Sequence, residues 1–456
     1  MLGGFGLPQL LQAESPGTAV PGRRRRPGKA KSVILLYLLG GAATQDMIDL
    51  KPNAAAEVRG EFNPISTNVP GIRVCEHLPR MSKWMHKIAL VRSLNHRAGC
   101  HNTLPSYTGL EQLLDNTSTR DTYPPSMGSV CELLRRDQGE LPDYVYMPCY
   151  LGWGQAIRRP GPYAGFLGQR YDALYTEVMP HRAPGGPAPA PGRPVTVLGE
   201  PRLPESTLAE GLTLDRLNTR RSLMNQIDDQ MRQADAQVSI DHFNRTQRRA
   251  FNLLTSAEVR SAFDLNLEDN RLRERYGRTL FGNCSLIARR LVEKGVRFVN
   301  VTWDLFWDRV PINYDCWDTH SNNFTTLKNV NLPEFDQVYS TLLEDLEMRG
   351  ILDETLVVVM SEMGRTPRIN ANGGGRDHWT YCYGMWFAGA GIKGGTVVGE
   401  SDSQAAYVKD RPISPADVCA TIYECLGIDP DMMVHDRAGR PIAAAQGGRA
   451  IREILQ

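Results

Sequence analysis

Continuous apolar runs rich in valine, isoleucine and leucine recur along the chain, each ending in glycine or in polar residues. Runs without alternating polar positions are typical of strands buried on both faces of a parallel sheet. They occupy residues 32–39, 88–91, 296–301 and 356–360, and a further apolar run with aromatic residues occupies 384–388. Segments with the apolar spacing or the end signals of helices lie between and after them, at 78–86, 127–136, 284–294, 333–349 and 414–426. Strands that alternate with helices predict an α/β fold, with a doubly wound, mostly parallel sheet and helices on both faces.

The length of 456 residues suits one large α/β domain with insertions, and we expect residues 31–456 to form it. A proline- and glycine-rich stretch at 160–204 predicts a loop, and amphipathic, highly charged segments predict a helical insertion at 213–290. Residues 1–30 combine the apolar core of an export signal with an arginine run, which we interpret as a solvated linker. The charged beginning of such a signal is missing, so we expect the signal to be truncated in this chain.

Composition is that of a soluble globular protein, with 41% hydrophobic and 23% charged residues. Basic and acidic residues nearly cancel, 52 against 51, so no broad basic field favours nucleic acid as a partner. No apolar run reaches the roughly 20 residues that a membrane-spanning helix needs. The nine cysteines are scattered without a C-x-x-C pair, so we expect buried thiols rather than a zinc ribbon or a disulfide framework.

Ionisable residues gather just after the predicted strands. The carboxyl ends of parallel strands meet at one edge of a sheet, where open α/β sheets bind their ligands, so these side chains are expected to converge. Carboxylates together with imidazoles suit zinc, manganese or iron, whereas carboxylates alone suit magnesium or calcium. The candidates are Asp46 (or Asp49), His96, His101, Asp318, His320, Glu362, Asp377 and His378.

Two arginines in the same region, Arg365 and Arg376, have the planar fork that recognises a tetrahedral anion. A metal beside them would polarise a phosphoryl or sulfuryl oxygen. A purely structural interpretation stays open for the same residues. Asp318 could simply orient His320, and Arg376 could form an ion pair with Asp377.

Several longer motifs resemble those of the DUF1501 family, a group of bacterial proteins related to sulfatases and alkaline phosphatases. The resemblance runs from Lys31 to Gln456. The motifs are GGAATQD at 40–46, DLKP at 49–52, VRS at 91–93, WDTHSN at 317–322, EMGRTP at 362–367, GRDHW at 375–379 and GIKGG at 391–395. The resemblance implies an exported, metal-dependent hydrolase of a sulfate or phosphate ester, with a polysaccharide as one candidate carrier, and export by the twin-arginine route.

The same resemblance implies a division of roles among the candidate residues. The divalent metal would be zinc, manganese, magnesium or calcium, held by Asp46, Asp318, His320, Glu362, Asp377 and His378. The anion would be bound by His96, Arg365 and Arg376. The attacking group would come from Ser93, Cys100, His101 or Thr103, or would be a metal-bound water.

The chain departs from the related enzymes in three places. They usually carry an aspartate after the first strand, where Gly40 stands, and Asp-His where this chain has Glu362 and Met363. Cys100 also lacks the Cys-x-Pro-x-Arg context of the sulfatase nucleophile. These departures keep a second hypothesis open, a catalytically inactive member of the fold that binds an anionic glycan or a protein partner. A third hypothesis, a cofactor-independent esterase that uses Ser93 or Ser361, lacks a G-x-S-x-G elbow.

Overall fold

An eight-stranded sheet forms the centre of the computed structural model, which describes residues 28–113, 118–134, 141–151, 158–184, 195–204, 257–304 and 316–456. Its strands follow the order β12-β4-β11-β8-β1-β7-β5-β6. Their bounds are β1 Ser32–Leu38, β4 Ile88–Leu94, β5 Tyr144–Met147, β6 Leu174–Tyr175, β7 Phe298–Trp303, β8 Thr355–Met360, β11 Tyr383–Gly389 and β12 Thr396–Val398.

The sheet is mostly parallel, as predicted. β1 pairs in parallel with β7 on one side and with β8 on the other, and β5 and β6 continue the parallel set. β11 differs, because it runs antiparallel between β8 and β4. The chain therefore leaves β8 and re-enters the sheet in β11 at the same edge. The long loop between these two strands, residues 361–382, stays at the carboxyl edge of the parallel strands.

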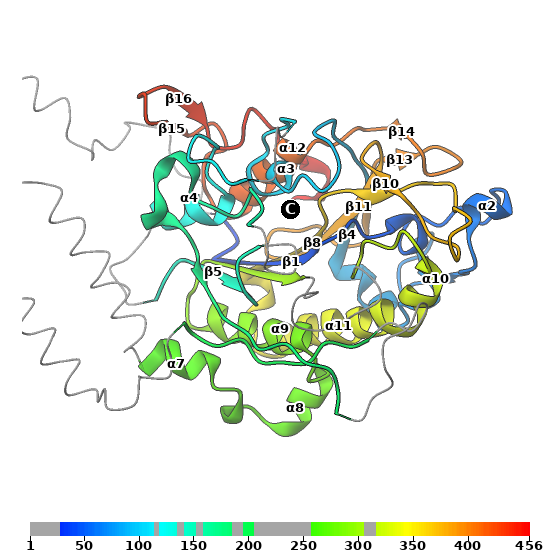
Figure 1. Cartoon of the computed structure of the whole chain (residues 1–456), viewed down its shortest axis with the longest axis horizontal. Coiled ribbons are helices and arrows are strands. Elements are labelled where there is room, and N and C mark those ends of the chain that lie inside the picture. The colour runs from blue at the N-terminus through cyan, green and yellow to red at the C-terminus, as the bar shows by residue number, and fades with distance from the viewer. Residues whose placement is uncertain are drawn as a thin grey trace, which may run out of the picture.

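Helices cover both faces of the sheet (Figure 1), which confirms the predicted layers. One face carries α9 (Leu280–Glu293) and α11 (Leu332–Met348), and the other carries α3 (Leu104–Thr108), α4 (Met127–Leu133) and α12 (Pro415–Cys425). Alternate residues of β1 enter two different cores: Ile34 and Leu36 pack on the side of α9 and α11, whereas Leu35 and Tyr37 pack on the side of α12. The β1 run is continuously apolar because both of its faces are buried.

Shorter elements complete the described chain. The helices are α2 Ala56–Arg59, α7 Ala257–Phe263, α8 Asn270–Arg275 and α10 Asn323–Thr326. Four small hairpins pair β2 Pro64–Ser66 with β3 Arg73–Cys75, β9 Gly364–Arg365 with β10 His378–Trp379, β13 Glu400–Ser401 with β14 Val408–Asp410, and β15 Met433–His435 with β16 Pro441–Ala443.

The helix predicted at 78–86 is instead a seven-residue 3-10 helix, η2 (Met81–Lys87). Its start is held from elsewhere in the chain, because the carboxylate of Asp336 in α11 accepts hydrogen bonds from the backbone N–H groups of Arg80 and Met81, at 2.9 and 2.7 Å. A contact across more than 250 residues decides this turn, so the local sequence pattern could not predict it.

The predicted domain features are only partly visible. The proposed export signal and most of its linker, and the first half of the helical insertion, lie outside the described residues, in 1–27 and 205–256. The described remainder of the insertion is helical, in α7, α8 and the start of α9. Part of the predicted loop at 160–204 joins the sheet, because β6 pairs in parallel with β5. Within the described residues, the structure has no helix that is both long enough and apolar enough to span a membrane.

Replacing Ser414 with alanine is expected to lower the free energy of unfolding by about 1 kcal/mol. Ser414 is the N-cap of α12: its hydroxyl accepts a hydrogen bond from the backbone N–H of Asp417 at 3.2 Å, and the Asp417 carboxylate accepts one from the Ser414 N–H at 2.9 Å. Urea denaturation of the full chain measures the change. Ser414→Asp, which can still cap the helix, is the matched control and should stay close to the wild type; equal losses in both variants would contradict the capping role.

Candidate functional site

The candidate site lies where the loops that follow β1, β4 and β8 meet a loop ahead of α10. Residues 95–103 follow β4, residues 316–322 precede α10, and the chain after β8 folds into the β9/β10 hairpin. In that hairpin His378 stands opposite Arg365. Gly375, just before β10, packs closely against the loop ahead of α10. A Cβ at position 375 would overlap the carbonyl oxygen of His320. The glycine run therefore lets the hairpin approach His320.

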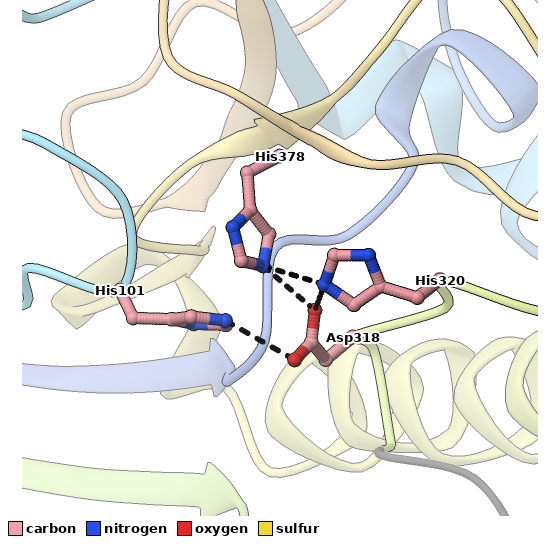
Figure 2. A group of neighbouring side chains, drawn as sticks. All are labelled: His101, Asp318, His320 and His378. Carbon is pink, nitrogen blue, oxygen red and sulfur yellow. Dashed lines mark hydrogen bonds and ion pairs between the residues drawn. The ribbon is translucent and has the colours of Figure 1, made fainter.

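Three imidazoles and one carboxylate converge at this place (Figure 2). The donor atoms of His101, Asp318, His320 and His378 all lie within 4.8 Å of one another. Nε2 of His320 and Nε2 of His378 are 2.8 Å apart, and each lies 3.1 Å from Oδ1 of Asp318. Nε2 of His101 lies 3.1 Å from the other oxygen, Oδ2. Residues separated by up to 277 positions in the chain thus present their donor atoms to one another.

The spacing of these atoms fits a metal ion. Bonds of about 2.0–2.2 Å from a tetrahedral ion to nitrogen and oxygen imply donor atoms roughly 3.3–3.5 Å apart. The separations between Asp318, His320 and His378 are 2.8–3.1 Å, so only small movements would be needed. A donor set of imidazoles with one carboxylate suits zinc, manganese or iron better than magnesium or calcium.

The orientation of His320 comes from Asp377. The Oδ1 atom of Asp377 lies 2.9 Å from Nδ1 of His320. A proton on Nδ1 leaves the lone pair of Nε2 directed at Asp318 and His378, which is the arrangement that metal-binding histidines use. The hydrogen bond from His320 lowers the pKa of Asp377. Asp377 therefore orients the candidate ligand His320 and is not itself a member of the four-residue group.

His101 bridges two buried carboxylates. Its Nδ1 lies 3.1 Å from Oε1 of Glu362, and its Nε2 faces Asp318. Burial by itself lowers the pKa of His101, but the hydrogen bonds to Asp318 and Glu362 outweigh it, and the net shift is upward. Glu362 is fully buried and also accepts a hydrogen bond from the backbone N–H of Gly40, at 2.9 Å. It holds His101 rather than joining the four-residue group.

Asp318 remains ionised in this environment. Burial would raise its pKa, but hydrogen bonds from His101 and His378, followed by the positive charge of Arg365, hold the pKa of this carboxyl far below its usual range. Asp318 can therefore serve as an anionic ligand at neutral pH.

A model of one protein family, described as "Protein of unknown function (DUF1501)", matches residues 30–455. The chain belongs to the DUF1501 family. This confirms the family expected from the sequence motifs. Among proteins of curated function, none matches the chain.

Solved structures show a looser likeness to this DUF1501 protein. A phosphonate monoester hydrolase from Silicibacter pomeroyi is 14% identical, with a TM-score of 0.37, and the match covers 93% of this chain and 76% of that one. A sulfatase from Pseudoalteromonas sp. is 12% identical, with a TM-score of 0.34 and coverage of 88% and 68%. A lipoteichoic acid synthase from Listeria monocytogenes is 9% identical, with a TM-score of 0.34 and coverage of 94% and 77%. These likenesses are too loose to carry a function, which has to come from the site.

Arg365, predicted to bind the anion, is a buried counter-ion in the DUF1501 structure. Its guanidinium contacts Oδ1 of Asp318 and the carbonyl oxygen of Gly40, and Nε donates to the carbonyl of Gly41 at 2.8 Å. Nη1 donates to the carbonyl of Arg376 at 3.2 Å. All three guanidinium nitrogens of Arg365 are therefore bonded to protein oxygens. Arg365 stabilises Asp318 and the turn after β1, and its guanidinium is not open to a ligand.

The structure does not bring Asp46 to the cluster. Nε and Nη2 of Arg376 donate to its two carboxylate oxygens at 2.8 and 2.7 Å, and Nδ2 of Asn323 donates to one of them at 2.9 Å. Asp46 and Arg376 are both buried, so the predicted ligand and the predicted anion receptor form a structural ion pair with each other. The alternative ligand Asp49 is engaged elsewhere, by Lys51 at 3.0 Å and by the hydroxyl of Ser401.

Three further candidates point away from the cluster. The hydroxyls of Ser93 and Thr103 are buried and donate to the carbonyls of Arg411 and Pro160, both at 2.5 Å. His96 accepts a hydrogen bond at Nδ1 from the N–H of Ala98, 3.2 Å away, so Nε2 carries the proton and donates to the carbonyl of Glu362 at 2.7 Å. Burial lowers the pKa of His96 and keeps it neutral at physiological pH. His96 thus supports the backbone of Glu362.

Cys100 does lie beside the cluster. All nine cysteines are free thiols, and Cys100 is the exposed one. Partial removal from water raises the pKa of its thiol. Arg365 acts against this effect, whereas Glu362 and Asp318 add to it, and the net shift is upward. The thiol therefore stays protonated at neutral pH, which makes it a weak nucleophile.

Sequence reasoning missed Arg159. Its Nη1 donates to the carbonyl of His101 at 2.7 Å, and its positive charge acts on Glu362 and Asp318. His101 has a positive φ of 51°, and this hydrogen bond holds the strained turn that directs its ring at the cluster. No local pattern marks Arg159, which lies in the proline- and glycine-rich part of the chain and far from any predicted strand end.

Proposed function

We propose that this protein hydrolyses a sulfate or phosphate ester with the help of a divalent metal held by Asp318, His320 and His378. The observation that carries the proposal is the mutual approach of these three donor groups, at 2.8–3.1 Å, at the carboxyl edge of a parallel sheet. A divalent ion bound there would polarise the ester and stabilise the charge that develops on its oxygen atoms. The donor chemistry favours zinc or manganese among the four metals expected from the sequence.

His101 is the proposed proton carrier. Each of its ring nitrogens lies 3.1 Å from a carboxylate oxygen, which favours the protonated imidazolium. From Nε2, on the side of the cluster, it can give a proton to the oxygen that leaves the ester. Glu362 is a positioning residue in this scheme, because it holds the opposite nitrogen of the ring.

Water is the attacking group that fits this geometry. The hydroxyls of Ser93, Thr103 and Ser361 donate to backbone carbonyls, which accounts for their only protons. Ser361 is also buried at 1% exposure. This arrangement argues against the serine esterase considered from the sequence.

Cys100→Ser is expected to leave turnover within about twofold of the wild type, because a protonated thiol contributes little as a nucleophile. The measurement is the steady-state rate on the best ester substrate, together with the mass of the peptide that contains Cys100, which should be that of unmodified cysteine. A rate loss of a hundredfold or more, or a modified residue at position 100, would instead make Cys100 the attacking group.

The test of the function is hydrolysis of nitrophenyl phosphate, phosphonate and sulfate esters and of sulfated oligosaccharides by the full chain. The protein would be assayed after chelation and again after reloading with zinc or manganese, and we expect turnover only after reloading. His101→Gln should keep the metal and lose about 10²–10⁴-fold in rate. The exposed His435→Gln is the matched control and should behave as the wild type.

Stoichiometric metal without turnover on any of these esters would contradict the hydrolase. It would favour the non-catalytic member of the fold, with the same pocket used only for binding. Export by the twin-arginine route stays a prediction from the family resemblance, and residues 1–27 lie outside the described part of the chain.

A further inference from the structure

An open hollow is lined partly by residues that are close in sequence to the proposed metal-binding cluster. Its volume is about 460 Å³, and its lining includes Asn95, Arg97, Tyr381, Tyr407, Lys409 and Arg411. It is joined to the cluster through two short stretches of chain. Arg97 lies four residues before His101, and Tyr381 lies three residues after His378. A molecule that occupied both the hollow and the cluster would therefore cross only the loop after β4 and the end of β10.

The rings of Tyr381 and Tyr407 line the hollow, and the ring of Trp379 packs against both of them. The ring centroids of Trp379 and Tyr381 are 4.8 Å apart, those of Trp379 and Tyr407 are 5.5 Å apart, and those of the two tyrosines are 5.8 Å apart. The indole N–H of Trp379 donates to the carbonyl of Ala406 at 2.5 Å and so ties the loop that carries Tyr407 to β10. Asp402 holds the same loop by accepting the N–H groups of Ala406 and Tyr407.

The rings of Tyr381 and Tyr407 lie at the protein surface and are not part of the hydrophobic core. Tyr381 and Tyr407 are 37% and 52% exposed, and they are the exposed tyrosines of the described residues. An ordered, exposed pair of aromatic rings offers large flat faces at little further entropic cost, and such faces bind the C–H surface of a sugar ring as readily as another side chain.

Most of the ionisable side chains that line the hollow are cationic. Arg97, Lys409 and Arg411 line it, against one acidic residue, Asp410. Lys409 and Arg411 already pair with Glu400 at 2.8 Å and Glu453 at 2.5 Å. The guanidinium of Arg97 lies 4.2 Å over the ring of Tyr381 and makes no ion pair with any described residue. Among the described residues, one cation is thus placed on an aromatic ring without a carboxylate partner.

We propose that this hollow binds one residue of an anionic saccharide, with the sugar ring on Tyr381 and Tyr407 and its charged group on Arg97. The neighbouring residue of the saccharide would then extend past Trp379 towards His378. The proposal extends the proposed function, since the saccharide would carry the ester, but binding in the hollow does not depend on turnover.

A single-stranded nucleic acid fits the hollow less well. Successive bases stack on rings that offer parallel, accessible faces along a basic groove. Here the rings are inclined to one another by 51–65°, and acidic residues already neutralise two of the three cations. Within the described part of the chain, one cation without an acidic partner stands beside two rings, and this arrangement fits one charged group on one sugar.

The test is binding to the full chain by calorimetry, with oligosaccharides of sulfated dextran, oligogalacturonate and unsulfated dextran of the same length, and an oligothymidylate. We expect the two anionic saccharides to bind and the neutral one to bind about tenfold or more weakly, because a charge-assisted hydrogen bond is lost. The two charged probes distinguish a sulfate from a carboxylate as the preferred group.

The decisive variant is Arg97→Gln, which should reduce binding of the charged probes to the level of the neutral one. Arg170→Gln is the matched control, because Arg170 also lies over a tyrosine, Tyr171, at 4.5 Å, but away from the hollow. Tyr407→Ala should weaken charged and neutral saccharides alike. Tighter binding of the oligothymidylate, no saccharide binding in the wild type, or equal effects of the two arginine variants would overturn the proposal.

The same titrations with His320→Ala/His378→Ala separate this proposal from the hydrolase. Saccharide binding that survives in this variant supports the hollow even if no ester is ever turned over. Binding that disappears with the histidines would place the saccharide in the metal-binding cluster and contradict the hollow.

Discussion

Replacing both His320 and His378 with alanine is expected to abolish stoichiometric metal binding while the protein keeps its stability. The two imidazoles supply two of the three proposed donors, and their side chains are 39% and 25% exposed, so the protein can lose them without a buried cavity. Loss of two ligands should lower the affinity for zinc or manganese by well over a hundredfold, since even the partners of ligands contribute 10–100-fold. Mass spectrometry of the native, metal-loaded chain measures the stoichiometry.

The histidine pair is a cleaner test than Asp318. Asp318 is also the counter-ion of Arg365, and both side chains are buried. Removing the carboxylate would leave a buried, unpaired guanidinium, at a cost of about 3–5 kcal/mol. Metal loss in an Asp318 variant could therefore reflect unfolding. His435→Ala controls for the loss of an imidazole, and a double variant that still binds one metal per chain would contradict the site.

Replacing Asp46 with alanine is expected to lower the free energy of unfolding by about 3–5 kcal/mol and to leave metal binding intact in the folded fraction. The change removes the counter-ion of Arg376 and the acceptor of the Asn323 amide, so a buried charge is left with only the backbone carbonyls of Val58, Thr366 and Pro367. Asp46→Asn should cost less, because the amide oxygen can still accept one of these hydrogen bonds. Urea denaturation measures the stability, and mass spectrometry measures the metal.

The matched control for Asp46 is an exposed ion pair. Lys409 and Glu400 lie 2.8 Å apart, with side chains 60% and 57% exposed. Lys409→Ala should leave the free energy of unfolding close to that of the wild type, because solvent screens such pairs. A folded Asp46→Ala protein that has lost its metal would restore Asp46 as a ligand, as the sequence had suggested.

The fold could be predicted from the sequence to a large extent because its central strands are buried on both faces. β1 and β8 match the predicted runs within one residue. Their valines, isoleucines and leucines have no solvent-facing positions to interrupt them, so the pattern is local and unambiguous. The antiparallel direction of β11 was not visible in the same pattern, because a buried strand is equally apolar in either direction.

The convergence of the four side chains of the cluster was also predictable. Asp318, His320, His378 and His101 were all candidates, since each stands in a loop that this kind of fold gathers at the carboxyl edge of the sheet. Their residue types, imidazoles with a carboxylate, indicated metal chemistry before the structure was known.

What each of these ionisable side chains does depends on partners that are remote in sequence. Asp46 and Asp318 both lie next to predicted elements, and both contact an arginine. Both carboxylate oxygens of Asp46 accept hydrogen bonds from Arg376, 330 positions away, whereas Oδ2 of Asp318 faces His101. Ser93 lies in β4 and Thr103 in the loop that follows it, but both donate their hydroxyl protons to backbone carbonyls of remote residues, Arg411 and Pro160. Periodicity, composition and spacing place a residue on an element, because these depend on near neighbours. The direction of a side chain, and whether its charge is already neutralised, depend on packing between segments hundreds of residues apart, and only the folded chain contains that information.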